Sequence, residues 1–471
     1  MNAKKILHFS FGPVGAAFLG FITLPIVAWF FSLEDVGRLT MLQVVISLSI
    51  TLFSLAMHQA YVREYNEEKN KFVLLKVVLL PGSMVLVLVI LVFVLLPVSI
   101  SDLFFGIDSN FLTFCLILGV VAAFFINFLS HVLRMQERGL AFSATQIMPK
   151  AILLVLIGCL ILFNLPNDFQ SLMLMNTVAI VSSLLLFSWL TKDSWLPAIY
   201  ASTDAALLKK LLRFSLPLVV GSLAYWGLTT MDRFFLSALT GFEELGVYSM
   251  AVSLAAGVSV VSVVFSNLWH PVIYKWVKEG VEQKRVQAVI ENMFLGVVFI
   301  WTMVGLFSWV LLYLLPDEYV AVEYLIIACV AMPLFYMLSE TTVVGIGIAR
   351  KTGYSMLASI LAFVVNGILN YLFIPEYGAS GAALATVLAF FVFFVVRTEA
   401  SSYLWLSLPR FKIYFLCIAY VTLTIVIVLN KASQSYFFII WLILFSLTVL
   451  FFFRRVSESF SYLKNIKGSE L

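Results

Sequence analysis

The chain has 471 residues, of which 62% are hydrophobic and only 11% are charged. With a mean hydropathy of +1.06 it cannot cover itself with a polar surface, which excludes an ordinary soluble enzyme or binding module. The net charge is only +4, and the basic residues are spread over many short loops. No nucleic-acid partner is therefore implied. These properties predict a membrane protein that crosses the bilayer many times.

The first apolar segment is interpreted as a retained span. It begins with the basic sequence MNAKKILHFSFG and continues to Phe31 through Pro13 and Pro25. A secretory signal peptide would be shorter and would end at a small-residue cleavage site, and no clear site of this kind follows.

Apolar runs of about 20 residues, each long enough to cross about 30 Å of hydrocarbon, recur along the whole chain. There are fourteen, at about 8–31, 40–61, 73–97, 111–133, 143–164, 171–190, 214–239, 247–270, 292–315, 320–348, 354–374, 380–400, 412–430 and 436–453. An even number of spans places both termini on the same side of the membrane.

The basic residues indicate which side that is. All but three of the 29 Lys and Arg residues fall on one side of this topology, the exceptions being Arg38, Arg233 and Lys431. Cytoplasmic loops are enriched in Lys and Arg, so both termini are predicted to be cytoplasmic. A wrong helix count would have scrambled this asymmetry.

A repeated turn indicates two related halves. EDVG from Glu34 and EELG from Glu243 each place two acids, an apolar residue and glycine at the start of a new span. We therefore expect an all-α polytopic fold of two six-helix bundles in parallel pseudo-repeat, followed by a C-terminal helix pair. The predicted domains are 1–200 (N-terminal bundle), 201–405 (C-terminal bundle) and 406–471 (helix pair and cytoplasmic tail).

The two longest loops, at about 191–213 and 271–291, are predicted to be cytoplasmic linkers. Each has about 20 residues, which is too few for a soluble catalytic domain. The first contains KDSWLPAIYASTDAALLKKLL, which is typical of a short amphipathic helix on the inner surface with its lysines toward lipid headgroups.

Asp232 and Arg233 are adjacent charges inside the seventh span. An ionisable side chain at the centre of a membrane helix costs about 2.5–3.5 kcal/mol, so such residues usually face a protein interior or a water-filled cavity. Counting from Phe214, Asp232 lies about 27 Å along the helix, in the outer third of the membrane. The equivalent residues of the first half are Thr23 and Leu24, so only one half carries these charges. The alternative is a structural ion pair with a neighbouring helix.

Lys150 follows Pro149 in the fifth span, about 10 Å inside the inner boundary. This depth is near the limit from which a lysine reaches the headgroups by extending its side chain. Proline also frees one carbonyl of the helix, which favours a wet cavity nearby. Cavity lining and simple extension to the headgroups are both open at this stage.

Glu340 lies about 15 Å from the inner edge of the tenth span, below a kink expected at Pro333. This depth suits a site for a proton or another cation. The alternative is a structural role, in which Glu340 bonds to Ser or Thr on an adjacent span.

Several motifs together carry a family resemblance. They are the EDVGRL turn at Glu34, the FSLP opening at Phe214 with MDR at Met231, and NGILNYLFIPEYGASGAALAT from Asn366. In this order and at these spans the chain resembles the polysaccharide-specific transporters of the multidrug/oligosaccharidyl-lipid/polysaccharide exporter superfamily, most closely the O-antigen flippases of the Wzx type. Asp232 and Arg233 match that family's Asp-Arg pair in span seven.

The resemblance implies movement of undecaprenyl-pyrophosphate-linked oligosaccharides across the bacterial inner membrane by alternating access. In that reading Arg233 and Lys150 bind substrate, whereas Asp232 or Glu340 carries the coupling H⁺ or Na⁺. No nucleotide-binding motif of the GxxxxGK[ST] kind occurs, which favours an ion gradient over ATP. No cofactor, metal site or catalytic residue is expected, since the cysteines stand singly. Other polysaccharide-assembly proteins are possible partners.

Two other functions are weighed against the flippase. A drug or cation antiporter of the same superfamily is disfavoured by the fourteen spans and the polysaccharide-type motifs. A membrane-embedded glycan polymerase or ligase would be expected to have an extended outer loop with catalytic Arg or His residues. Here the predicted outer loops are short and acidic and contain no His.

The Lys and Arg asymmetry yields a direct test of the topology. A reporter fused after Lys431 is expected to report the outer side, and one fused after Lys467 the cytoplasm. If both fusions report the same side, the last helix pair is assigned wrongly.

Overall fold

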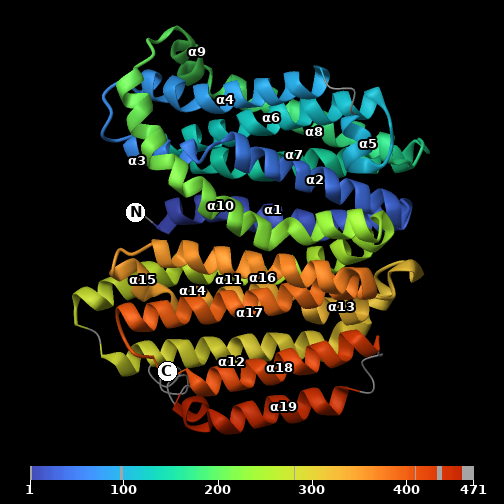
Figure 1. The fold of residues 1–471 in the computed structure, drawn as a ribbon, viewed down its shortest axis with the longest axis vertical. Helices are drawn as coiled ribbons and strands as arrows, with labels where there is room; N and C mark the ends of the chain where they lie inside the picture. The colour runs from blue at the N-terminus through green and yellow to red at the C-terminus, as the bar shows by residue number, and fades with distance from the viewer. Residues whose placement is uncertain (1–2, 96–98, 281, 409, 432–436, 459–471) are drawn as a thin grey trace, which may run out of the picture. The chain divides into compact units, whose positions relative to one another are not determined.

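The computed structural model describes residues 3–95, 99–280, 282–408, 410–431 and 437–458, and every regular element in these ranges is helical (Figure 1). The backbone contacts divide the chain into two compact units, Met1–Gly246 (unit 1) and Val247–Leu471 (unit 2). The predicted domain boundaries at residues 200 and 405 follow the sequence repeat and not the backbone contacts. They therefore stay a prediction.

Unit 1 contains ten helices and the first turn of an eleventh within the described ranges. They are α1 (Ala3–Phe30), α2 (Leu33–Phe53), α3 (Met57–Glu64), α4 (Lys71–Leu95), α5 (Ile100–Phe105), α6 (Asn110–Met135), α7 (Gly139–Leu162), α8 (Phe169–Leu190), α9 (Lys192–Tyr200), α10 (Ala205–Leu239) and the start of α11 (Phe242–Lys278). The closest packing joins α1 to α7 and α6 to α8.

Unit 2 continues α11 and adds the remaining elements. They are α12 (Gln283–Phe307), η1 (Ser308–Tyr313), η2 (Asp317–Tyr319), α13 (Val322–Cys329), α14 (Ala331–Thr342), α15 (Val344–Ile348), α16 (Gly353–Tyr377), α17 (Ala379–Leu404), α18 (Phe411–Asn430) and α19 (Phe438–Phe451). Here α16 packs along α17, and α14 also packs against α17.

The described helices confirm the predicted fold class. Thirteen are long and apolar enough to cross a membrane, and α19 is a shorter apolar helix at the place of the fourteenth predicted span. The chain is therefore an all-α membrane protein of about 14 spans.

Two predicted spans are broken rather than continuous. The second is divided into α2 and α3 by Leu55 and Ala56, whose φ angles of 47° and 54° belong to the left-handed region that side chains with a β carbon rarely adopt. The tenth is divided into α13, α14 and α15, so Glu340 lies in a helix of only 12 residues. Hydropathy sums over a window and therefore detects the apolar stretch but not the break.

Most of each predicted linker is helical, as expected for the first but not for the second. Residues 192–213 form α9 and the first turns of α10, separated by a short bend, instead of one amphipathic helix. Lys76 donates from its ammonium to the carbonyls of Ile199 and Ala201, at 2.9 and 2.6 Å, which ties the end of α9 to α4. Residues 271–291 are largely the ends of α11 and α12.

A buried acid links α3 to α10 in unit 1. Glu64 at the end of α3 is buried, and its carboxylate accepts a short hydrogen bond from Lys210 of α10. The guanidinium of the neighbouring Arg63 lies 3.7 Å from the same carboxylate. Lys210, predicted to face lipid headgroups, therefore has a protein partner.

The repeated turns are positions where two backbones meet. A β carbon on Gly37 of α2 would lie 2.0 Å from the carbonyl oxygen of Phe242, and one on Gly246 would lie 2.2 Å from that of Leu33. Both contacts are within unit 1. The glycines that marked the repeat in the sequence are therefore required because no side chain fits between these turns.

We expect Gly37→Ala and Gly246→Ala each to destabilise the folded protein by about 1–3 kcal/mol, since the clashing atoms belong to backbone that cannot rotate away. The measurement is thermal unfolding of the purified protein in detergent. Gly158→Ala in α7 is the matched control, because no atom lies within 4 Å of the β carbon it would add. Equal effects of all three substitutions would contradict the close approach.

Candidate functional site: buried charges in each unit

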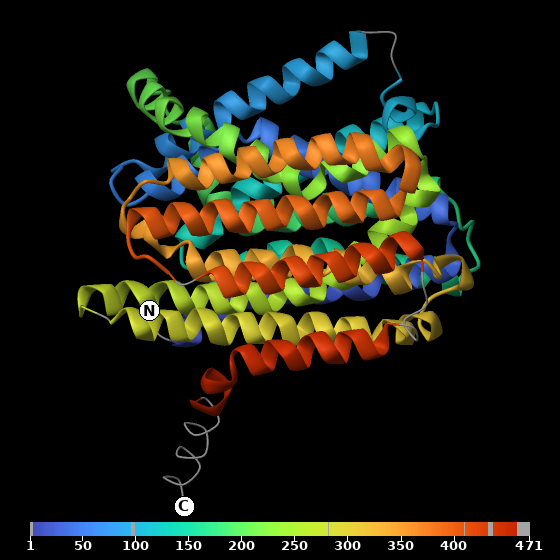
Figure 2. The same ribbon diagram turned by 60° about the horizontal axis from the view of Figure 1, so that its bottom comes forward.

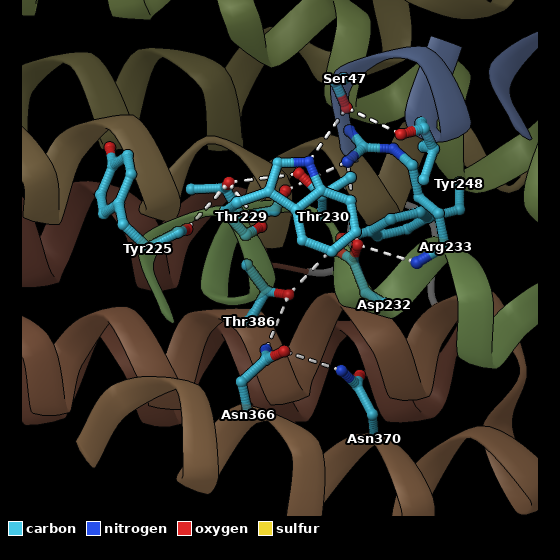
Figure 3. Close-up of polar contacts among 12 residues, drawn as sticks. Ser47, Tyr225, Thr229, Thr230, Asp232, Arg233, Tyr248, Asn366, Asn370 and Thr386 are labelled. Carbon is cyan, nitrogen blue, oxygen red and sulfur yellow. Dashed lines mark hydrogen bonds and ion pairs between the residues drawn. The ribbon is translucent and has the colours of Figure 1, made fainter. Parts of the chain in front are cut away.

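Asp232 and Arg233 lie on α10 in unit 1. Asp232 is 3% exposed, and its carboxylate accepts from the backbone N–H of Arg233 at 2.9 Å. The Arg233 guanidinium lies 3.8 Å from that carboxylate and donates to the carbonyl of Thr229 at 3.1 Å (Figure 3). The guanidinium is thus held along its own helix, one turn back from its α carbon.

A second contact fixes the same face of α10. The indole N–H of Trp226 donates to the hydroxyl of Ser47 on α2 at 3.0 Å (Figure 3). The ring of Trp226 also packs against Phe234, with centroids 6.0 Å apart. Because Phe234 lies on α10 itself, the bond to Ser47 is the contact of Trp226 that ties α10 to α2, less than two turns before Asp232.

Lys150 contacts a different helix. Its ammonium donates to the carbonyl of Ala16 on α1 at 2.8 Å, beside Gly20, whose missing side chain leaves room for it. The residue as a whole is exposed at the surface of the protein. The α1–α7 contact therefore orients the lysine while one side of it stays accessible.

Glu340 has two basic neighbours in unit 2. Its carboxylate accepts from Arg397 of α17 at 2.8 Å, and the imidazole of His270 of α11 lies 3.4 Å away. Glu340 is 6% exposed and Arg397 is 9% exposed, so the ion pair is removed from solvent. The alternative prediction gave Glu340 a Ser or Thr partner on an adjacent span. The structure instead pairs it with the guanidinium of Arg397 on α17.

Arg397 is the main residue that sequence reasoning missed. The predicted span 380–400 contains it near the cytoplasmic end, but its burial inside α17 was not expected. Its guanidinium also donates to Ser339 at 2.9 Å and lies over the ring of Phe393 at 4.8 Å. Its position two turns before the end of α17 could have indicated a buried charge.

His270 is the last residue of the predicted span 247–270 and was given no role. The structure continues α11 to Lys278, two turns beyond this histidine, and brings the imidazole to Glu340. The His270 contact becomes an ion pair only when the imidazole is protonated.

A chain of buried amides lies elsewhere in unit 2. Asn370 donates to Asn366 at 2.8 Å, and Asn366 donates to Thr386 at 3.4 Å, both asparagines being fully buried (Figure 3). Among the described residues, the side-chain oxygen of Asn370 has no hydrogen-bond partner. The sequence placed these asparagines in a family motif without a role, although their four-residue spacing on an apolar helix was visible.

The structure thus brings the predicted residues together only in part. Asp232 contacts Arg233, and Glu340 contacts the unpredicted Arg397. Lys150 and Arg233, both in unit 1, bond to different helices and share no partner in the described ranges. Within unit 1, the predicted charges are therefore separate positions and not one cluster.

A family profile described as "Polysaccharide biosynthesis protein" matches residues 3–277. No curated protein matches the chain at a significant level. Among solved structures, a lipid II flippase MurJ in an inward closed conformation has a TM-score of 0.68 at 15% identity, covering 98% of this chain and 99% of that one.

Multidrug transporters show the same fold over less of the chain. An inward-facing MATE family transporter of the MOP superfamily has a TM-score of 0.59 at 17% identity and covers 84% of this chain. An outward-facing structure of such a transporter has a TM-score of 0.51 at 18% identity and covers 85%. At these identities the likeness establishes the fold.

The Glu340–Arg397 pair can be tested by a double substitution. Arg397→Met leaves a buried carboxylate without its partner and is expected to destabilise the protein by about 3–5 kcal/mol. Adding Glu340→Gln removes the charge and should restore much of the loss. The measurements are membrane abundance and thermal unfolding, with the exposed Lys351→Met as control. A double variant no more stable than Arg397→Met alone would contradict the pairing.

Proposed function

The chain belongs to the family of polysaccharide biosynthesis proteins, and from this premise we propose that it is a flippase for undecaprenyl-pyrophosphate-linked oligosaccharide repeat units of O-antigen or a similar surface polysaccharide. It works in the bacterial inner membrane, with both termini in the cytoplasm. It forms no covalent intermediate and is not an enzyme.

The observation that carries the proposal is the combination of this family with a fold shared over almost the full length with a lipid II flippase. Multidrug transporters share the fold over a smaller part of the chain. This favours a lipid-linked substrate over a drug or cation.

The physical problem that such a protein solves is desolvation. A pyrophosphate and several sugars lose hydrogen bonds to water when they enter hydrocarbon, at several kcal/mol for each unsatisfied group and far more for each charge. The polyprenyl tail can stay in lipid throughout. A path lined by polar and cationic groups therefore needs to accept only the headgroup.

Arg233 and Lys150 are the cations we assign to the pyrophosphate. Arg233 uses one nitrogen for Thr229 and keeps further N–H donors, which suits bidentate contact with phosphate oxygens. The ammonium of Lys150 donates to the carbonyl of Ala16 and belongs to an exposed residue. Their positions on different helices would let the anion be passed from one to the other.

Asp232 or Glu340 is the group we assign to ion coupling, with H⁺ or Na⁺ as the ion. Both carboxylates are buried, and each lies beside a guanidinium. Movement of that guanidinium toward substrate would leave the carboxylate to be neutralised by a cation, which links the two binding events.

The substrate role of the cations predicts a loss of export. Arg233→Ala and Lys150→Ala should each reduce surface polysaccharide in a complementation assay about ten- to hundredfold per unit of membrane protein, as expected for loss of a hydrogen bond to a charged group. Arg233→Lys should restore export only in part, because it keeps the charge but loses the bidentate geometry.

Lys351→Ala removes an exposed cation and is the control. If Arg233 were only structural, Arg233→Ala would lower protein abundance, and neutralising Asp232 would restore it. Full export by the Arg233→Ala, Lys150→Ala double variant at normal abundance would end the assignment, and export of a drug cation instead of glycan would favour the antiporter.

Ion coupling by Glu340 has its own test in vesicles. Glu340→Gln should abolish transport driven by an ion gradient, because an amide cannot release and rebind a proton or neutralise a sodium ion. Because Glu340→Gln leaves Arg397 buried without its carboxylate, transport is normalised to the amount of folded protein in the membrane, and the Glu340→Gln, Arg397→Met double variant is measured beside it. Unchanged gradient-driven transport would remove Glu340 from the mechanism and leave Asp232 as the candidate.

A further inference from the structure

Five basic side chains line one cavity at an end of unit 2. The cavity has a volume of about 670 Å³ and lies where α12, the residues before α18 and the end of α19 meet. Figure 2 shows α19 running beside α12, with which it packs. The charged lining residues are Lys284, Arg410, Lys412, Arg454 and Arg455, together with Glu291 and Glu458.

The arginines of this basic cavity are partly neutralised. Arg410 forms a bidentate pair with Glu399, one contact being 2.6 Å between Nη2 and Oε2. Arg454 and Arg455 share the single carboxylate of Glu458, at 3.2 and 3.1 Å. Glu458 can therefore balance only one of these two arginines.

The lysines are not neutralised. Among the described residues, neither Lys284 nor Lys412 has a hydrogen bond or an ion pair. Counting the five cations against Glu291, Glu458 and Glu399 leaves an excess of two positive charges. Such an excess gathered around one cavity favours an anion with two negative charges.

The wall of the cavity is apolar on one side. Phe411 is 82% exposed and Phe451 is 51% exposed, whereas Phe452 is buried against Phe294, with ring centroids 5.5 Å apart. In a protein that spans the membrane, exposed phenylalanines at a helix end face lipid. A ligand that fits this surface has an anionic head and a hydrocarbon part.

We propose that the basic cavity binds the headgroup of an anionic glycerophospholipid with two phosphates, diphosphatidylglycerol, from the leaflet that the Lys and Arg asymmetry identifies as cytoplasmic. Basic pockets between helix ends on that side recognise such headgroups through charge. The two phosphates match the excess charge, and the acyl chains would lie along Phe411 and Phe451. This site is separate from the positions assigned to the transported lipid.

Ordinary basic residues at the membrane surface lack this arrangement. Lys275 near the end of α11 is 74% exposed and pairs with Glu279, just beyond the same helix. Lys284, Lys412 and Arg455 come instead from three different segments and line one cavity. Basic side chains from several segments that line the same cavity can contact one ligand together, whereas isolated surface lysines cannot.

The test is native mass spectrometry of the purified full chain in detergent, titrated with diphosphatidylglycerol, phosphatidylglycerol or phosphatidylethanolamine. The wild type should retain one diphosphatidylglycerol most tightly. Lys284→Gln with Lys412→Gln should weaken that binding about thirtyfold, from the loss of two headgroup contacts. Lys284→Arg with Lys412→Arg should keep it.

The matched control is Lys275→Gln with Lys278→Gln, which removes two charges from the same unit outside the cavity and should leave binding unchanged. Circular dichroism and gel filtration confirm that each variant is folded. Equal losses in the two Gln pairs, or equal binding of phosphatidylethanolamine, would overturn the proposal. So would tighter binding of a polyprenyl diphosphate, which would make the occupant a transport substrate, or displacement by millimolar inorganic phosphate.

Discussion

The buried ion pair between Glu340 and Arg397 fixes how α14 packs on α17. Neither charge could stay in an apolar interior without the other, since a lone buried charge costs several kcal/mol. Two residues after Glu340 and one residue after Arg397, the hydroxyls of Thr342 and Thr398 meet at 2.7 Å, so the same two helices share a polar seam. Because both helices are largely buried among apolar side chains, which offer no competing hydrogen-bond partners, this seam sets the register of the two helices. The short helix α14 is interrupted at both ends. Its side-chain bonds to α17 hold it in place in spite of these interruptions.

The charges of unit 1 are held in another way. Arg233 is bonded to its own helix, and Lys150 to the backbone of a neighbouring one, so neither is committed to an opposite charge on another helix. Releasing a cation from a carbonyl costs less than separating it from a buried carboxylate. The protein thus combines a strongly paired site in unit 2, suited to stability or to slow coupling, with more readily available cations in unit 1.

The sequence alone predicted the fold class, the approximate spans and the family. The first two depend on hydropathy summed over a segment, and the family depends on several motifs taken together. Apolar length located the spans, and the family match confirms the polysaccharide relationship, whereas the O-antigen type stays a prediction. Breaks were missed because the left-handed Leu55 and Ala56 carry no glycine or proline signal. The partner of Glu340 was missed because an arginine near a helix end reads as a surface anchor until its depth is known. Pairing between helices depends on rotation about their axes, which hydropathy does not report.

The Glu64–Lys210 bond has a consequence for biosynthesis. The two residues are 146 positions apart, so at about 5–20 residues per second the acid is made about 7–30 s before its lysine. During that interval α3 is already in place while α10 does not exist. Arg63, the residue immediately before the acid, is made at the same moment and lies 3.7 Å from the carboxylate in the finished protein. An adjacent cation of this kind can balance the charge of Glu64 while the chain is inserted into the membrane. Once Lys210 has been made and bonds to Glu64, Arg63 is no longer needed for that balance.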